Sequence, residues 1–214
     1  MMFLPDSLEF LHIDNNIAVV IKPVGISSEG ESGMPGLVKT ALTQKGITCT
    51  VYPLHRLDTA VGGVMIFALN KFTAAKMSAD ITEKKLKKEY LAVVHGAPSE
   101  KTGVFSDLLF KDSRKNKSFI VNRMRKGVKE ASLEYEVLGE REGLSLVKIL
   151  LHTGRTHQIR VQFSGRKMPL FGDGKYGAKD NSYIALFSWR LTLPGGKSFC
   201  AKPKNTYPWS LFEI

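Results

Sequence analysis

Two short segments of the sequence combine charged residues with turn-forming residues, and both could carry chemistry. The first reads His55-Arg56-Leu57-Asp58-Thr59 and precedes Gly62-Gly63 and an apolar run over residues 64–69. A catalytic group in a loop beside a strand stays accessible while the sheet fixes its position. The alternative reading of the same residues is a turn held by side-chain hydrogen bonds and a surface ion pair.

The second segment is Gly154-Arg155-Thr156-His157-Gln158-Ile159-Arg160, preceded by Leu151-His152-Thr153. Its pattern predicts a helix over residues 156–163, with Thr153 or Thr156 as its cap. On that helix Thr156 and Arg160 are four residues apart and share one face. Arg160 is then expected to reach a partner in a cleft.

Asp58 and Arg160 together suggest nucleophilic chemistry. Burial alone favours a protonated carboxyl, whereas a nearby guanidinium favours the ionised form, so a pair of these groups stays charged when substrate excludes water. Such a carboxylate suits attack on an electrophilic sugar carbon. Glycosidases normally use a second carboxyl to protonate the leaving group and activate water, and neither segment supplies one. An isomerase that returns the same base to the same sugar needs no such water.

The histidines and cysteines argue against a metal centre. His152 and His157 are five residues apart with no Cys or carboxylate nearby in the sequence, and zinc needs at least three such ligands. Cys49 and Cys200 form no Cys-x-x-Cys pair, which favours two buried, inert thiols in a reducing compartment. No apolar run approaches the 18 residues of a membrane span. We therefore expect a cytoplasmic protein without a metal centre.

The charge is unusual and unevenly spread. The 214 residues carry a net charge of +11 with 31 Lys plus Arg, which favours a polyanionic partner such as a nucleic acid. Residues 111–129, called the basic segment below, contribute +7 of that total. The segment lacks the apolar period of a membrane-bound helix. A solvated face or mobile loop is the alternative to a role in gripping phosphates.

Many short strands and few helices are expected. Strands are predicted over residues 8–13, 17–21, 64–69, 90–94, 131–138 and 144–151, and helices over residues 35–44, 71–83 and 156–163. Residues 140–143 connect two alternating segments as a hairpin turn would. This pattern indicates an α+β fold with a mixed, mainly antiparallel central sheet and a few covering helices. No linker is evident, so residues 1–214 are expected to form one catalytic domain with a groove.

Five motifs in order make the sequence similar to the RluA type of pseudouridine synthase. The family's His-Arg-Leu-Asp segment corresponds to residues 55–58. The other four motifs are Lys22-Pro23-Val24-Gly25, Lys88-Glu89-Tyr90-Leu91-Ala92, the segment 154–160 and Gly172-Asp173-Gly174-Lys175-Tyr176-Gly177. The series spans residues 22–177, far more than one short motif could support.

The resemblance implies an RNA-binding cleft and conversion of uridine to pseudouridine in ribosomal or transfer RNA, with no cofactor and no metal. It makes Asp58 the nucleophile, Tyr90 the ring that stacks on the target uracil, and Arg160 the partner of Asp58. Arg56 would fill the gap that the flipped base leaves. Flipping is required because the enzyme cannot reach C1′ and rotate a stacked base. Whether Asp58 attacks C1′ or removes a sugar proton stays open.

Two departures from the family pattern keep a second reading open. Val61-Gly62 replaces the usual Thr-Ser, and Gln162 stands where a His commonly follows Arg-Val. The alternative is a catalytically silent RNA-binding protein on the same fold. Because the chain begins shortly before the first motif, no separate N-terminal RNA-binding domain is expected, and RNA recognition by a monomer would come from the catalytic domain. The predicted RNA-binding residues are His55, Arg56, Arg155, Arg123, Arg125 and Lys126.

Overall fold

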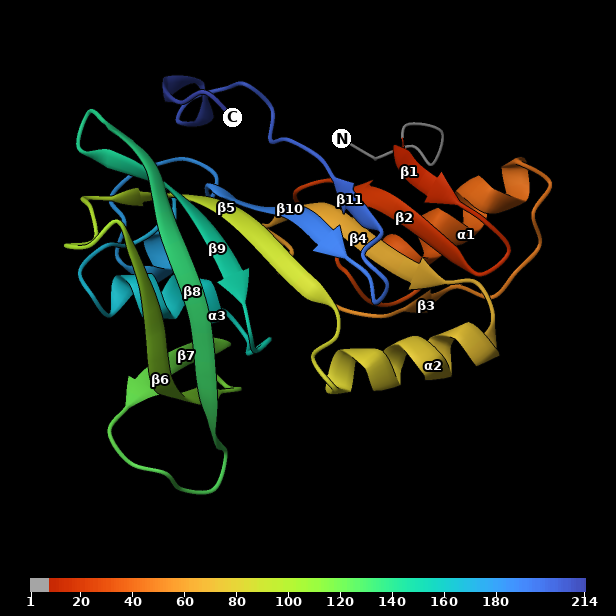
Figure 1. The fold of residues 1–214 in the computed structure, drawn as a ribbon, viewed down its shortest axis with the longest axis horizontal. Helices are drawn as coiled ribbons and strands as arrows, with labels where there is room; N and C mark the ends of the chain where they lie inside the picture. Colours follow the sequence, from red (N-terminus) through yellow and green to blue (C-terminus); the bar gives the residue numbers. More distant parts are fainter. Residues whose placement is uncertain (1–7) are drawn as a thin grey trace. The chain divides into compact units, whose positions relative to one another are not determined.

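The computed structural model describes residues 8–214, which form two compact units (Figure 1). The first unit holds the chain up to Lys87 and residues 188–202, and the second holds residues 88–187 and the chain from Pro203 onward. Each unit is built mainly of antiparallel strands, with three α-helices in the whole described chain. The predicted α+β class and its mainly antiparallel sheet are confirmed. The single catalytic domain over residues 1–214 stays a prediction.

The first unit is a sheet with the strand order β1-β2-β4-β10. Its strands are β1 (Phe10–Ile13), β2 (Ile17–Lys22), β3 (Tyr52–Pro53), β4 (Gly62–Ala68), β10 (Leu186–Thr192) and β11 (Ser198–Cys200), with β3 paired to β4 and β11 to β10. All seven residues of β4 are buried, as expected for an apolar strand covered on both faces.

Two helices accompany the first unit's sheet. Helix α1 (Met34–Gln44) buries Met34, Val38, Ala41 and Leu42 on one stripe. Helix α2 (Lys71–Thr82) places Met77 in a core cluster with Val19, Val64 and Ile66 of the sheet. Asn70 caps α2, because its side chain accepts a hydrogen bond from the Thr73 N–H at 2.8 Å.

The second unit has the strand order β5-β9-β8-β6-β7. Its strands are β5 (Lys87–His95), β6 (Thr102–Asp112), β7 (Lys117–Val121), β8 (Val128–Arg141) and β9 (Leu144–Leu151). Glu142 and Gly143 both adopt positive φ between β8 and β9, which is the two-residue turn that the twist of a hairpin favours. The predicted hairpin at residues 140–143 is therefore confirmed.

Helix α3 (Gln158–Ser164) lies against the second unit's sheet. Phe163 on α3 lies 5.1 Å from the ring of Phe105 on β6 and 6.2 Å from that of Tyr135 on β8. Two short 3-10 turns complete the unit, at Gly174–Tyr176 and Trp209–Leu211. Among residues 8–214, none of the helices has the length and apolar character that crossing a membrane requires.

The predicted start of α3 was wrong. Neither Thr153 nor Thr156 caps the helix, and Thr156 lies outside it, so its shared face with Arg160 is lost. His157 takes the cap position with a left-handed φ of 52°. The Gln158 side chain turns back instead, and its Oε1 accepts hydrogen bonds from Thr153 Oγ1 at 2.7 Å and the Arg155 N–H at 3.1 Å.

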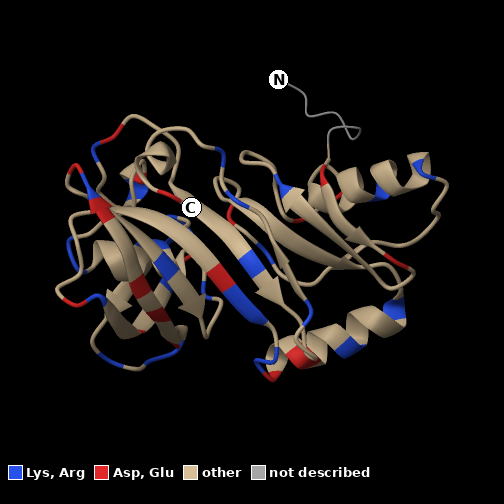
Figure 2. Ribbon diagram, turned by 45° about the horizontal axis from the view of Figure 1, so that its top comes forward, with Lys and Arg blue, Asp and Glu red and all other residues tan. Residues whose placement is uncertain are grey.

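The basic segment is not a single loop. It contains the end of β6, all of β7 and the start of β8, and β6 pairs with both of the other strands. Arg123, Arg125 and Lys126 are exposed in the connection from β7 to β8, where Figure 2 shows basic residues in blue. Strand β7 ends the strand order, so among the described strands none pairs with its second edge.

Candidate functional site

The ammonium group of Lys22 holds the loop that carries Asp58. Lys22 is 1% exposed at the end of β2, beside the start of β4. Its Nζ donates hydrogen bonds to the carbonyl oxygens of Pro23 at 2.9 Å, Thr59 at 3.2 Å and Val61 at 2.8 Å. Two of these carbonyls, those of Thr59 and Val61, lie one and three residues after Asp58, so one buried cation fixes the loop directly after the predicted nucleophile.

Burial lowers the pKa of Lys22 to about 8, and attraction to the Asp58 carboxylate raises it again in part. The charged ammonium is therefore buried at a desolvation cost that the three carbonyls and Asp58 offset only in part. This lysine was not predicted as a site residue. The signal was available in the sequence, because a lysine directly continues the apolar run of β2 and belongs to the first family motif.

Further contacts fix the same loop to the sheet. Ser28 Oγ donates to the Leu57 carbonyl at 2.7 Å, and the Leu57 N–H donates to Ser28 Oγ at 3.0 Å. A Cβ on Gly63 would lie 2.3 Å from the Ser188 carbonyl oxygen, and Gly63 has a φ of +119°, so only glycine fits this close approach. Asp58 itself is partly exposed. The loop is rigid where it meets the strand.

The Val61-Gly62 departure is compatible with this arrangement. Val61 is 2% exposed, and its backbone carbonyl rather than its side chain accepts the hydrogen bond from Lys22. The hydrogen bonds from Lys22 to the Thr59 and Val61 carbonyls are called the clamp below. A hydroxyl at position 61 is therefore not needed to hold the loop.

Two predicted RNA-binding residues flank this loop. Arg56 is exposed, and its guanidinium lies 3.0 Å and 3.1 Å from the two carboxylate oxygens of Glu29. His55 is half-buried, and its Nε2 accepts a hydrogen bond from the Ile66 N–H of β4 at 3.3 Å. His55 thus ties the loop to the strand, while Arg56 pairs with Glu29 at the surface; contact of either residue with RNA stays a prediction.

In the second unit, Arg160 forms a buried bidentate ion pair with Asp173. Its Nε lies 2.7 Å from Oδ2 of Asp173 and its Nη2 lies 2.8 Å from Oδ1. Arg160 is 5% exposed and Asp173 is fully buried. A bidentate pair fixes both the position and the plane of a guanidinium. Asp173 was not predicted, although it stands between two glycines in the last family motif.

The loop that carries Asp173 has its own anchor. The Asp180 carboxylate accepts a hydrogen bond from the Gly172 N–H at 3.0 Å and lies 2.6 Å from Nε2 of His95, at the end of β5. Burial raises the pKa of Asp180, but these hydrogen bonds outweigh it and leave that pKa below its usual range. The ionised carboxylate therefore ties residue 172 to β5.

Tyr90 and the helix that carries Arg160 lie on the same face of the second unit's sheet. Tyr90 on β5 pairs with Ile149 on β9, which pairs with Tyr135 on β8, and directly opposed residues share a face. Tyr135 packs against Phe163 of α3, the helix that carries Arg160. Tyr90 is buried. Because Asp58 belongs to the other unit, its pairing with Arg160 stays a prediction.

The remaining predicted residues have separate surroundings. Arg155 Nε donates to the Glu130 carbonyl on β8 at 2.9 Å, close to the start of that strand. Gln162 is fully buried, and its Nε2 donates to Asp107 Oδ2 on β6 at 2.7 Å. The amide therefore links α3 to β6, which gives the replaced histidine position a structural task.

The two histidines considered as metal ligands have different partners. His152 Nε2 lies 2.8 Å from Glu134 Oε1, and His157 Nδ1 lies 3.0 Å from the hydroxyl of Tyr176. Within residues 8–214, no group of three or more His, Cys, Asp or Glu side chains is arranged to hold a metal ion. The absence of a metal from the reaction stays a prediction.

Comparison with known proteins adds independent information. A family model described as RNA pseudouridylate synthase matches residues 16–165. Ribosomal large subunit pseudouridine synthase C of Buchnera aphidicola is 32% identical over 171 residues, covering 79% of this chain and 54% of that protein. An uncharacterized RNA pseudouridine synthase of Bacillus subtilis is 32% identical over 177 residues, covering 79% and 58%. The chain thus spans little more than half the length of these curated relatives.

Solved structures agree on the fold. Human RNA pseudouridylate synthase domain containing 4 superposes with a TM-score of 0.80 at 23% identity, covering 92% of this chain and 89% of that one. Human RNA pseudouridylate synthase domain containing 1 gives a TM-score of 0.77 at 22% identity, covering 98% and 89%. At these identities the superpositions establish the fold alone.

Proposed function

This chain belongs to the RNA pseudouridylate synthase family, as its motifs predicted, and on that basis we propose that it isomerises uridine to pseudouridine in RNA. The observation that carries the proposal is the clamp of Lys22 on the Asp58 loop. The buried ammonium holds the Thr59 and Val61 carbonyls, so the position of Asp58 is set before substrate arrives. A nucleophile gains most from such pre-organisation.

In the proposed reaction the Asp58 carboxylate acts as nucleophile while the bond from uracil N1 to C1′ breaks and a bond from C5 to C1′ forms. The base stays with the same sugar, C5 loses its proton, and N1, no longer bonded to the sugar, takes up a proton, so that the product is an isomer of the substrate. Tyr90 is proposed to stack on the uracil, and Arg160, with its plane fixed by Asp173, to pair with Asp58. Attack at C1′ and removal of a sugar proton remain the two routes for the first step.

Base flipping brings the uridine to Asp58 at a cost of a few kcal/mol of unstacking. Arg56 is proposed to occupy the gap in the RNA. Its ion pair with Glu29 is solvent-exposed on both sides, with side-chain exposures of 58% and 59%. Exposed pairs of this kind contribute about 0–1 kcal/mol, so Arg56 can leave Glu29 at little cost.

The proposed substrate is ribosomal RNA, with transfer RNA as the second candidate. Several relatives carry names that refer to the large ribosomal subunit. The basic segment, with Arg123, Arg125 and Lys126 exposed, is proposed to hold phosphates. We further propose a monomer that works in the cytoplasm without metal or cofactor.

Release of tritium from RNA labelled at uridine C5 tests the proposal. Wild-type protein is expected to release tritium and form pseudouridine, with Asp58→Asn reducing the rate at least about a thousandfold, as loss of a catalytic group typically does. Asp80→Asn, which changes an aspartate on α2, serves as the matched control and is expected to retain activity. Mapping pseudouridines in total RNA with and without the protein then identifies the substrate.

A catalytically silent RNA-binding protein is the competing function, and the same experiment separates the two. RNA binding by wild-type protein without tritium release from ribosomal or transfer RNA would establish the silent form. The backbone clamp argues against it, because the Val61-Gly62 replacement leaves the Asp58 loop anchored.

A further inference from the structure

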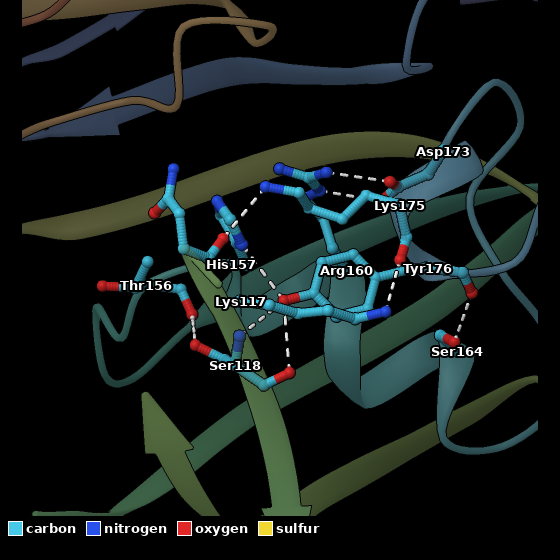
Figure 3. Close-up of polar contacts among 10 residues, drawn as sticks. Lys117, Ser118, Thr156, His157, Arg160, Ser164, Asp173, Lys175 and Tyr176 are labelled. Carbon is cyan, nitrogen blue, oxygen red and sulfur yellow. Dashed lines mark hydrogen bonds and ion pairs between the residues drawn. The ribbon is translucent and has the colours of Figure 1, made fainter. Parts of the chain in front are cut away.

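Tyr176 lies between the basic segment and Arg160 (Figure 3). The Ser118 N–H of β7 donates to its hydroxyl at 2.8 Å, and the Ser118 carbonyl lies 3.3 Å from the same oxygen. His157 Nδ1, at the start of α3, lies 3.0 Å from it. One buried hydroxyl therefore joins a strand of the basic segment to the helix that carries Arg160.

The ring of Tyr176 makes a second link. The guanidinium carbon of Arg160 lies 5.1 Å from the ring centroid, and the ammonium of Lys117 lies 4.8 Å from it. Both distances are within the range of cation–π attraction. Arg160 is thus held by Asp173 at its Nε and Nη2 and by the Tyr176 ring beside its plane.

Other bonds connect β7 to the same loops. Ser118 Oγ donates to the Thr156 carbonyl at 2.6 Å, and Lys175 Nζ donates to the Asn116 carbonyl at 3.0 Å. Lys117 Nζ in turn donates to the Lys175 carbonyl. Three consecutive residues of the basic segment are therefore fastened to the two loops that flank Arg160.

Strand β7 has basic residues on both sides of it in the chain and Tyr176 at one edge. Strand β7 pairs with β6 along one edge, and its other edge carries the Ser118 N–H that meets Tyr176. The connections at both ends of β7 carry basic residues, Arg114 and Lys115 on one side and Arg123, Arg125 and Lys126 on the other. A phosphate bound at either connection would therefore act on a segment that directly continues β7, the strand that contacts Tyr176.

We propose that Tyr176 is a positioning residue that couples the basic segment to Arg160, so that phosphates bound to the basic segment set the position of the Arg160 guanidinium. This inference rests on the proposed function and adds a route by which RNA binding improves the site. It assigns the last family motif two tasks: Asp173 fixes Arg160, and Tyr176 ties Arg160 to the RNA-facing strand.

Kinetics of Tyr176→Phe provide the first test, because phenylalanine keeps the ring and removes the hydroxyl. We expect kcat for pseudouridine formation to fall about tenfold, as loss of one or two hydrogen bonds permits, with KM and RNA affinity within twofold of wild type. Tyr183→Phe is the matched control, since the Tyr183 hydroxyl donates to the Tyr207 carbonyl at 2.6 Å and lies 3.0 Å from Thr206 Oγ1, and neither partner belongs to α3 or β7. It is expected to leave kcat unchanged.

A spectroscopic test separates coupling from simple structural support and needs no turnover. The Nε–H signal of Arg160, identified by its loss in Arg160→Lys, is followed by nitrogen-15 NMR as oligocytidylate is added. This RNA has phosphates but no uridine. We expect the signal to shift in wild-type protein and in Tyr183→Phe, and to shift by less than half as much in Tyr176→Phe at saturating RNA.

The outcomes distinguish the inference from the proposed function. A wild-type protein that binds RNA but releases no tritium overturns the proposed activity, and the NMR titration still decides the coupling. Tritium release with an unchanged kcat in Tyr176→Phe overturns the inference alone. An Arg160 signal that does not move in wild-type protein, or that moves equally in Tyr176→Phe, also overturns it.

Discussion

Replacing Lys22 by methionine is expected to abolish most activity while leaving the protein folded. Methionine is close in length to lysine and removes the ammonium that holds the Pro23, Thr59 and Val61 carbonyls. Without these bonds the Asp58 loop samples other positions. A displacement of about 1 Å at a reacting group costs about a hundredfold in rate, which is the loss we expect in kcat.

Two opposing terms keep the stability change small. A pKa lowered from 10.5 to about 8 means that burying the ammonium costs about 3 kcal/mol at neutral pH, and methionine removes that cost. Against this, the buried Val61 carbonyl loses its donor at a cost of about 1–3 kcal/mol, while the other two carbonyls are only partly buried. The net change in unfolding free energy is expected to stay within about 2 kcal/mol.

The difference in unfolding free energy between wild type and Lys22→Met is expected to depend on pH. Between pH 8 and 10.5 the unfolded lysine keeps its proton while the folded one has lost it, so rising pH stabilises the wild-type protein relative to Lys22→Met. The difference in unfolding free energy is expected to move by about 2–3 kcal/mol in favour of wild type from pH 7 to pH 10.

Urea unfolding at several pH values, together with single-turnover rates on labelled RNA, tests both parts. A difference between wild type and Lys22→Met that stays flat from pH 7 to pH 10 refutes the buried ammonium. A variant that folds and keeps wild-type kcat refutes the role of the clamp in placing Asp58.

Three further predictions concern the RNA surface and the buried ion pair. We expect that changing Arg123, Arg125 and Lys126 together to Gln reduces the slope of log affinity against log salt by about 2–3. The control variant, which removes the same charge by changing Lys39, Lys71 and Lys76 to Gln, is expected to leave the slope unchanged, and equal slopes for the two variants contradict the phosphate role. Glu29→Gln frees Arg56 and is expected to raise RNA affinity by up to about fivefold, since the exposed pair is worth at most about 1 kcal/mol; unchanged affinity argues against contact of Arg56 with RNA. Asp173→Asn leaves the buried Arg160 charge uncompensated, so we expect it to lower the free energy of unfolding by about 3–5 kcal/mol and Tm by about 6–20 °C in a calorimetric scan. A Tm that falls by less than about 2 °C would falsify this reading of the ion pair.

Strong local patterns made much of the fold predictable. The apolar run at residues 64–69 and the alternation at residues 144–151 became β4 and β9 almost as predicted. Helix α2 begins after Asn70 because that side chain supplies the cap, and Asn is a residue type that predicts a helix start from the sequence.

Other elements left no comparable signal. Strand β7 is five residues long and lies among lysines and arginines, so the charge of the basic segment conceals its strand pattern. The start of α3 was predicted two residues early because a left-handed His157 and the turned-back Gln158 side chain are tertiary features with no helical period.

The candidate site was predictable in its motifs but not in its supports. Asp58, Tyr90 and Arg160 follow from family motifs. Lys22 and Asp173 also stand in family motifs, but the contacts that they make become visible only once the chain is folded. Lys22 acts on carbonyls 37 and 39 residues away in sequence. Asp173 reaches Arg160 from a loop between Gly172, with a φ of 75°, and Gly177, with a φ of 104°. Spacing along the chain encodes neither contact.

The two buried cations solve different problems, and their chemistry explains why one is lysine and the other arginine. The compact ammonium of Lys22 has three donors, and all three are used by backbone carbonyls, so none remains to cover an oxygen of Asp58. Its charge acts on Asp58 through space alone. The guanidinium of Arg160 has five donors in a plane, of which Asp173 takes Nε and one Nη2 proton. A planar fork suits the two oxygens of one carboxylate, whereas a compact ammonium suits three carbonyls that converge from different directions.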